Sequence, residues 1–146
     1  MDVGPLGTWV VGARLRVAAT GSRAPEEAWD LFTRPAAWPT WAPHIRQVDY
    51  PHPTIRPATT GRVTGVGGVV AVFQIGTVDE EARRWTWRVR SGPVRFAFEH
   101  GVDPEGPAEG TSGGSTAWIV ARGPGPLVLG YAPVARLSLG RLVADG

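Results

Sequence analysis

The sequence contains no cysteine and no lysine, and it has no long apolar run. Without cysteine, disulfides, thiol nucleophiles and zinc–thiolate sites are excluded. No stretch approaches the roughly 20 apolar residues that a membrane-spanning helix needs. Residues 1–8 lack the basic and apolar regions of a signal peptide. We therefore expect a soluble cytoplasmic protein without a membrane span.

All fifteen basic residues are arginines, and thirteen acids leave a formal net charge of only +2. A nucleic-acid-binding protein gathers its basic residues on one face. Here they are scattered, in groups no larger than pairs such as Arg88 and Arg90, so we expect no nucleic-acid partner. The histidines, His44, His52 and His100, show no metal-ligand spacing and have no acidic cluster beside them. We predict neither a metal nor a cofactor.

The most informative segment is residues 35–48, in which Trp38 and Trp41 stand between three prolines. Proline fixes φ and favours extended backbone at the preceding residue, so this segment cannot be one long helix. Large aromatic residues on a stiff connector typically cover a core or line a cavity. The pattern indicates a function that involves a cavity, with Trp38 and Trp41 as candidate ligand-binding residues.

Hydrophobic periodicity around this connector predicts an α+β fold in one domain over residues 1–146. The expected elements are strands at 8–20, 44–50, 60–64, 69–78, 84–90, 94–102 and 115–122, and helices at 25–32 and 126–143. Residues 1–7 and 103–114 are expected to be flexible. This order predicts a curved antiparallel sheet of about seven strands around the long C-terminal helix, with short helices between strands 1 and 2. Such a sheet leaves space beneath the helix, where ligand cavities arise.

Several segments resemble the START-like, or SRPBCC helix-grip, superfamily, in particular its polyketide cyclase/dehydrase and lipid-transport group. They are residues 24–32, residues 38–41 running into Val48, residues 84–87, the glycine-rich stretch before residues 115–118, and the closing helix. The resemblance extends from about Leu15 to Val143 and implies the helix-grip fold. Function stays open, because such proteins include aromatase/cyclases, hydrophobic-ligand carriers, plant hormone receptors and chaperone-binding modules.

The chain departs from this family pattern in two ways. Its closing helix is short and carries Gly130, Pro133 and Gly140, which implies a looser grip on the sheet. It also lacks the lysine with which some relatives anchor an acidic ligand, so any acidic ligand here would need arginine.

Alternation on the two middle strands places aromatic residues on one face of the sheet. This face carries Trp85, Trp87, Phe96, Phe98 and His100, and Trp118 could join it from the last strand. The rings either stack a flat apolar ligand or pack an ordinary core; the ligand-binding candidates among them are Trp87, Phe96, Phe98 and Trp118. Arg88 and Arg90 face solvent, unless a bulge reverses the phase and turns them into the cavity to bind a carboxylate or enolate.

Three residues are catalytic candidates if the protein is an enzyme. His100 is either a pocket-facing acid–base group or a half-solvated residue at a strand end, and the pattern favours the second. His44 lies at the expected cavity mouth, where it either orients a ligand carbonyl or phenol, or bonds the connector backbone. Tyr131 is on the apolar stripe of the last helix, and a buried phenol seeks a partner in the protein or in a ligand.

The first functional hypothesis is a module that binds a hydrophobic small molecule between the sheet and the C-terminal helix. The alternative is a polyketide cyclase/aromatase that steers aldol cyclisation and dehydration of a poly-β-keto intermediate; the sequence leaves open whether there is turnover. Convergence of His44, His100 and Tyr131 on one void would favour catalysis. Partner binding through the outer sheet face is disfavoured, because no large apolar alternation remains for it, and a homodimer is possible but unsupported.

Overall fold

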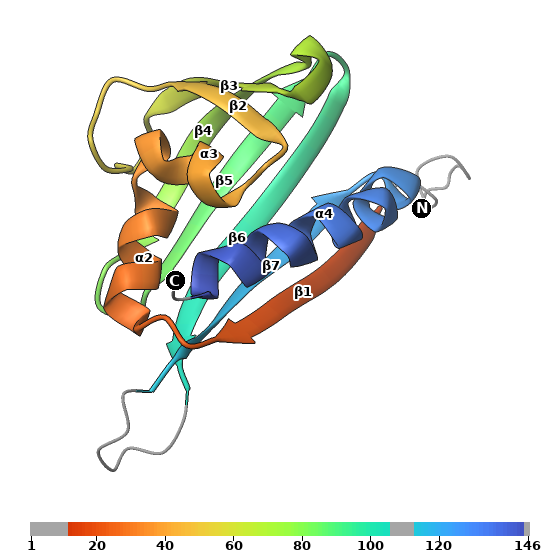
Figure 1. Cartoon of the computed structure of the whole chain (residues 1–146). Helices are drawn as coiled ribbons and strands as arrows, with labels where there is room; N and C mark the ends of the chain where they lie inside the picture. Colours follow the sequence, from red (N-terminus) through yellow and green to blue (C-terminus); the bar gives the residue numbers. More distant parts are fainter. Residues whose placement is uncertain (1–11, 106–112, 145–146) are drawn as a thin grey trace.

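The computed structural model describes residues 12–105 and 113–144. Seven antiparallel strands form one curved sheet in the order β1-β7-β6-β5-β4-β3-β2, and helix α4 lies along its concave face (Figure 1). The elements are β1 (Ala13–Gly21), α2 (Pro25–Thr33), the 3₁₀ helix η1 (Pro35–Ala37), α3 (Trp38–Trp41), β2 (Ile45–Asp49), β3 (Thr60–Gly65), η2 (Val66–Gly68), β4 (Val70–Asp79), β5 (Arg84–Ser91), β6 (Val94–Pro104), β7 (Ser115–Gly123) and α4 (Gly125–Val143). The predicted fold class is confirmed.

The predicted strand limits agree closely with the observed ones, except around the long β6–β7 connection. Asp103 and Pro104, which we assigned to a flexible loop, extend β6 and pair with Thr116 and Ser115 of β7. The remainder of that predicted loop from residue 106 to 112, the predicted flexible residues 1–7, and the first part of the predicted opening strand lie outside the described residues.

Strand alternation separates the sheet into an inner face toward α4 and an outer face. On β5, Trp85, Trp87 and Val89 point inward, where Trp85 is buried and the other two are half-buried. On β6, Phe98 and His100 continue the inner face because they are paired directly with Trp87 and Trp85. Successive residues of a strand point to opposite faces, so Thr86, Arg88 and Arg90, which alternate with the inward residues, lie outside.

Helix α4 buries the apolar stripe that its 3.6-residue periodicity predicts. Its buried residues are Val128, Ala135, Ser138, Leu139, Leu142 and Val143, and Tyr131 and Ala132 are partly buried beside them. The helix contacts mainly β1 and β7. Strand β7 presents small inward residues there, Ala117 and Ala121, which allow α4 to approach the sheet closely.

Arg23 fixes the C-terminal end of α4 to the connection between β1 and α2. Its Nε donates to the Leu142 carbonyl at 2.8 Å, its backbone N–H donates to the Val143 carbonyl at 2.8 Å, and its second guanidinium nitrogen donates to the Ala144 carbonyl. The last carbonyls of a helix have no partners within the helix. Arg23 therefore supplies donors to this end of α4 and places a positive charge at the negative end of its dipole.

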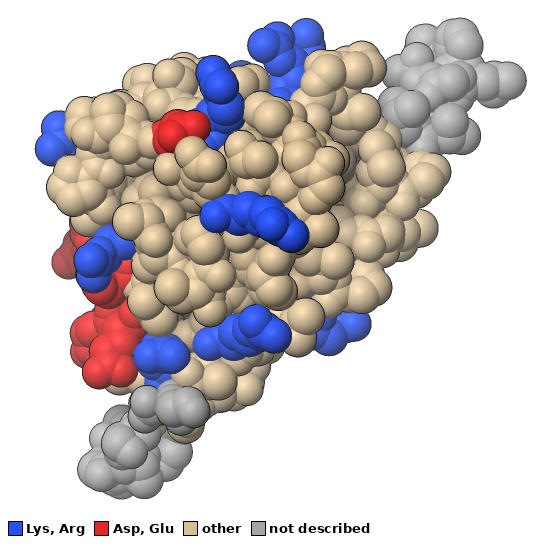
Figure 2. Space-filling view, turned by 45° about the horizontal axis from the view of Figure 1, so that its top comes forward, with Lys and Arg blue, Asp and Glu red and all other residues tan. Residues whose placement is uncertain are grey.

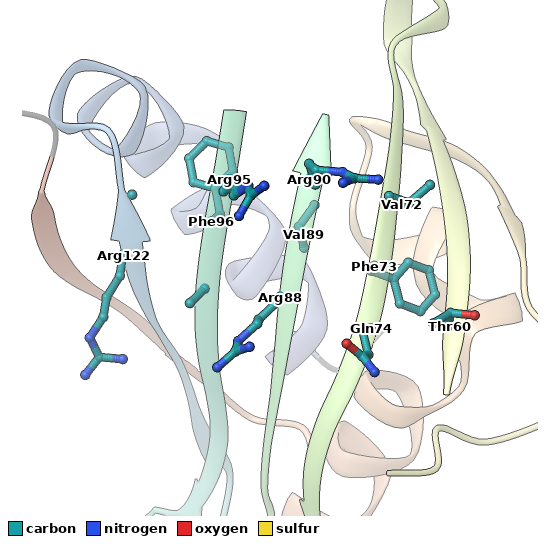
Figure 3. A pocket seen from close by; sticks show the side chains of 12 residues that line it. Thr60, Val72, Phe73, Gln74, Arg88, Val89, Arg90, Arg95, Phe96 and Arg122 are labelled. Atoms are coloured by element: carbon teal, nitrogen blue, oxygen red, sulfur yellow. The ribbon is translucent and has the colours of Figure 1, made fainter. Parts of the chain in front are cut away.

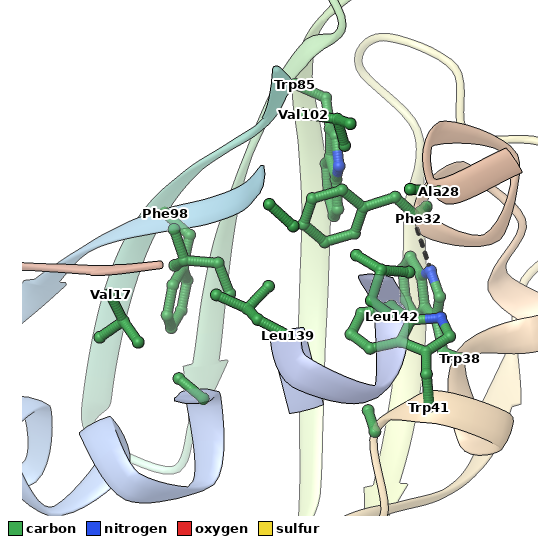
Figure 4. Packing of buried hydrophobic residues seen from close by; sticks show 14 of the residues in the cluster. Val17, Ala28, Phe32, Trp38, Trp41, Trp85, Phe98, Val102, Leu139 and Leu142 are labelled. Carbon is green, nitrogen blue, oxygen red and sulfur yellow. Dashed lines mark hydrogen bonds between the residues drawn. The ribbon is translucent and has the colours of Figure 1, made fainter. Parts of the chain in front are cut away.

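The connector tryptophans bind the end of α2, as Figure 4 shows for Trp38. The Trp38 indole N–H donates to the Phe32 carbonyl at 2.9 Å, and the Trp41 indole N–H donates to the Leu31 carbonyl at 3.1 Å. Both rings are buried, Trp38 at 2% exposure and Trp41 at 8%. These tryptophans thus cap the last turn of α2 while they fill the space between α2 and the sheet.

Charged residues are unevenly distributed over the surface. Figure 2 shows arginines dispersed over one face, and most of the acidic side chains in this view gathered on the side where α2 lies. Glu26, Glu27 and Asp30 of α2 are all exposed there. Within residues 12–105 and 113–144, no helix is long and apolar enough to cross a membrane.

Candidate functional site

The inner face of the sheet carries a continuous cluster of aromatic rings that is closed at the α2 end. Phe32 has no exposed surface and Trp85 is 2% exposed. His100 stacks on Trp85 with ring centroids 3.8 Å apart and an interplanar angle of 5°, and Phe32 meets His100 edge-on at 5.3 Å. This end of the cluster is a packed core.

The opposite end of the cluster, beside the N-terminal half of α4, is only half-buried. We call it the mouth and define it by His44, Trp87, Val89, Phe96 and Tyr131. His44 and Tyr131 meet edge-on at 5.9 Å. Phe98 is buried behind the mouth and joins its two sides, since it lies 5.7 Å from Tyr131 and 6.2 Å from Trp87. The mouth is therefore walled by β5, β6, α4 and the start of β2.

Two polar atoms of the mouth are buried without a hydrogen-bond partner among the described residues: His44 Nδ1 and Trp87 Nε1. The indole nitrogens of Trp29, Trp38 and Trp41, by contrast, all donate to protein oxygens. A buried polar atom that makes no hydrogen bond costs about 1–3 kcal/mol. The mouth thus combines apolar walls with two polar atoms that can bond a ligand. Trp85 Nε1 and Ser138 Oγ are unpartnered as well.

Burial keeps all three titratable candidates uncharged at neutral pH. Desolvation lowers the pKa of His44. Desolvation also lowers the pKa of His100 to about 3, and a weak hydrogen bond with the Trp85 carbonyl raises this pKa to a smaller extent. Desolvation also raises the pKa of Tyr131 to about 12. Tyr131 is therefore a neutral hydroxyl donor, and His44 is a neutral imidazole.

The structure brings some of the predicted site residues together and separates others. At the mouth His44 contacts Tyr131, and Phe98 connects Tyr131 with Phe96 and Trp87. His100 is 3% exposed within the closed end, so neither the pocket-facing nor the half-solvated interpretation describes it.

The connector tryptophans, Trp38 and Trp41, belong to the buried core rather than to an open wall. Trp38 packs edge-on against Trp87 at 5.1 Å. Both indoles are held by backbone carbonyls of α2, as described above.

The prediction that Trp118 joins the inner aromatic wall is wrong. Trp118 lies on the outer face over Gly101, where any β-carbon on the glycine would collide with the indole ring. Arg84 and Arg16 stack over the ring at 4.9 and 5.5 Å, and its Nε1 donates to Asp103 at 3.2 Å. The inward positions of β7 belong instead to Ser115, Ala117, Ile119 and Ala121, all of which are buried.

Arg88 and Arg90 lie on the outer face, as the alternation predicts. The bulge that interrupts this part of the sheet is in β4, between Ile75 and Val78, and it leaves the phase of β5 unchanged. Sequence reasoning missed a hollow of about 680 Å³ on the outer face, lined by both arginines and by Arg95 and Arg122. Its lining comes from several strands, so only the sheet register reveals it.

The donor set for a metal is sparse. Among residues 12–105 and 113–144, no group of three or more histidine, cysteine, aspartate or glutamate side chains could hold an ion.

The curved sheet, the gripping helix and the aromatic mouth define a helix-grip protein. The chain belongs to the polyketide cyclase/dehydrase and lipid transport family, whose model matches residues 12–146. This confirms the resemblance that we drew from the sequence. Family and fold together support a hydrophobic ligand-binding or polyketide cyclase-type domain.

Comparison with solved structures supports the same fold. The crystal structure of Ara h 8.0201 superposes with a TM-score of 0.63 at 12% sequence identity, covering 90% of this chain and 97% of that chain. At this identity the likeness shows the fold alone. No curated protein matches the sequence significantly.

Proposed function

We propose that this protein binds a flat, apolar small molecule that carries at least one oxygen acceptor, and that it binds this molecule at the mouth. The observation that supports the proposal is the unpartnered Trp87 Nε1 donor within half-buried aromatic walls. Ligand sites are typically apolar concavities in which a few placed polar groups fix the orientation of the ligand. A ligand carbonyl that accepts from Trp87 Nε1 would remove the cost of the buried, unbonded N–H.

Binding requires movement of side chains at the mouth. Trp87 Nε1 is buried, and the surrounding aromatic rings are in contact with one another. A ligand can therefore reach this nitrogen only when one of these side chains changes its rotamer. Tyr131 is the candidate for this movement because it lies on α4 at the half-buried edge of the cluster. Rotamer changes of this kind are common on binding and leave the backbone in place.

Removal of the indole N–H with retention of an aromatic ring tests this proposal. Calorimetry would compare 2-acetylnaphthalene, a flat ketone, with naphthalene, which has no acceptor. We expect Trp87→Phe to weaken binding of the ketone about fivefold and to leave naphthalene within about twofold, because one hydrogen bond contributes about 1 kcal/mol. The matched control is Trp29→Phe, whose indole N–H bonds Glu80 instead.

Two results would contradict the proposal. One is failure of both compounds to bind the unaltered protein at millimolar concentration. The other is an equal loss of both compounds in Trp87→Phe, which would indicate a collapsed mouth rather than a missing donor.

A second candidate function, cyclisation of a poly-β-keto chain, is favoured by the contact between His44 and Tyr131 at 5.9 Å. Neutral His44 would take a proton from the carbon between two carbonyls, while the Tyr131 hydroxyl donates to the developing enolate oxygen. The carbanion would form the new C–C bond with a second carbonyl. His44 would return its proton to the resulting alkoxide before water is lost.

Turnover of a synthetic poly-β-keto thioester decides between binding and catalysis. An enzyme would lose at least a hundredfold in rate in Tyr131→Phe with affinity nearly intact, since one hydrogen-bond donor to a developing oxyanion contributes about 10²–10³-fold. A binding protein would give no product above the buffer rate even when unaltered. His100 is unsuitable for this test, because its removal disturbs the core.

A further inference from the structure

The outer face of the sheet carries two kinds of arginine. The first kind is neutralised or stacked within the protein. Arg84 pairs with Asp103 at 2.8 Å, Arg122 pairs with Glu99 at 3.1 Å, and Arg16 lies over the Trp118 ring. These residues form a self-contained network toward β1 and β7.

Arg88, Arg90 and Arg95 belong to the second kind. None of the three makes an ion pair with any residue in the described ranges, and all are exposed. Arg90 and Arg95 are moreover direct cross-strand partners in the β5–β6 hairpin. Like charges directly opposite each other destabilise an antiparallel pair. The β5–β6 hairpin therefore contains a repulsive contact, between Arg90 and Arg95, that does not stabilise the fold.

These arginines surround the hollow of about 680 Å³ on the outer face (Figure 3). Ala97 forms a low floor because its two cross-strand partners, Arg88 and Arg122, rise on either side of it. A second hollow of about 460 Å³ adjoins the first and shares Gln74, Arg88, Ala97 and Arg122 with it. We call the two hollows together the outer groove. The volume of each hollow is within the range of small-molecule sites.

We propose that the outer groove binds a small organic molecule that carries a phosphate or pyrophosphate group. Arg88, Arg90, Arg95 and Arg122, less Glu99, give the groove a formal charge of 4 − 1 = +3. The planar guanidinium group matches phosphate oxygens in bidentate geometry. Val72 and Ala97, with the aliphatic stems of the arginines, offer an apolar surface for the remainder of the ligand.

The bounded hollow favours a small anion over a nucleic acid. Its arginines without an ion pair, Arg88, Arg90 and Arg95, all come from the β5–β6 hairpin. Other arginines without an ion pair among the described residues are spread over β1, β2, β3, α4 and the β2–β3 connection: Arg14, Arg46, Arg56, Arg62, Arg136 and Arg141. A long polyanion would need a basic track that continues across the surface. The outer groove lies on the opposite side of the sheet from the mouth, so this proposal is independent of the function proposed above.

Charge-matched double variants test the proposal by calorimetry at low ionic strength, with inorganic pyrophosphate and phenyl phosphate as probes and inorganic phosphate for comparison. We expect Arg90→Gln/Arg95→Gln to weaken both probes at least about tenfold, because charge-assisted bonds to phosphate are lost. The control, Arg136→Gln/Arg141→Gln, removes the same two charges from exposed positions on α4 and should change affinity less than about twofold. Phenyl phosphate should bind more tightly than inorganic phosphate if the apolar surface contributes.

The proposal is overturned if pyrophosphate does not bind the unaltered protein, or if both double variants lose affinity equally, which indicates a response to net charge alone. A single-stranded oligonucleotide that binds more tightly than phenyl phosphate and depends on Arg90 and Arg95 would also overturn it. Retained binding of 2-acetylnaphthalene in Arg90→Gln/Arg95→Gln shows that the mouth is intact.

Discussion

The inner and outer faces of the β5–β6 hairpin arise from the same alternating residues but meet different physical demands. Inward, Trp85 and Trp87 belong to a ring cluster in which most neighbours touch. Outward, Arg88 and Arg90 have no ionic partner among the described residues. Packed rings stabilise the fold through burial and dispersion, whereas exposed charges contribute little to stability. The outer side chains are therefore available for binding without much consequence for folding.

The largest contrast should appear when one tryptophan is truncated on each face. Trp85→Ala should lower the free energy of unfolding by about 3–5 kcal/mol, because it leaves a cavity among fully buried rings. Trp118→Ala should cost less than about 2 kcal/mol, since it removes a half-exposed ring with two arginine contacts and one hydrogen bond. Urea denaturation of both variants gives the two values. Equal losses of unfolding free energy in the two variants would show that the greater burial of the inner face does not make it contribute more to stability.

Lowering the pH should reduce the free energy of unfolding, because His100 is buried and neutral in the inner cluster. The pKa of His100 is about 3 in the folded state and its ordinary value is 6.5. Protonation therefore favours the unfolded chain, so the stability is intact above pH 6.5 and is lost as the pH falls toward 3. Between pH 7.5 and pH 5 the loss should be about 2 kcal/mol.

The variant His100→Phe keeps a flat ring against Trp85 and cannot be protonated. Its free energy of unfolding, measured in urea at several pH values, should not show the decrease of about 2 kcal/mol between pH 7.5 and pH 5. The substitution itself should shift the free energy of unfolding by the same amount at every pH. If the two proteins lose stability in parallel between pH 7.5 and pH 5, then His100 is not the titrating group.

The smallest effect concerns the repulsive pair on the outer face. Arg95→Glu places opposite charges across the hairpin at Arg90 and should raise stability by about 0.5–1 kcal/mol. Arg95→Gln should give a smaller gain, and 1 M NaCl should reduce both gains through screening. The midpoint of urea unfolding measures these shifts. A loss of stability in Arg95→Glu would mean that Arg90 and Arg95 do not repel in the folded protein.

The sequence predicts the parts of this molecule that depend on local periodicity. The period of two on residues 84–90 and 94–102 identifies the inner rings, and the 3.6-residue stripe on α4 identifies the helix face that covers them. These signals suffice for the fold and for the position of Tyr131. They also place Arg88 and Arg90 outside, because a regular strand cannot turn both faces inward.

Features that depend on register or on close approach were not predictable. Both faces of β7 contain apolar residues, so alternation alone does not orient Trp118. The structure places the Trp118 ring over Gly101 of β6, a residue without a side chain, on the face opposite to the buried Ala117, Ile119 and Ala121. The outer groove joins Arg88, Ala97 and Arg122, which become neighbours only through strand pairing. The unpartnered nitrogens of His44 and Trp87 likewise follow from atomic geometry that no residue pattern contains.

The attachment of Arg23 to the last turn of α4 makes the two ends of this helix mechanically unequal. Among the described residues, the other half of the helix, with Gly130 and the exposed Pro133, has no comparable set of hydrogen bonds to a neighbouring segment. Any loosening of the helix from the sheet should therefore begin at its first turns and fade toward Leu142. A ligand bound at the mouth would then enter beside Tyr131, and the packing of the core around Phe32 would not change.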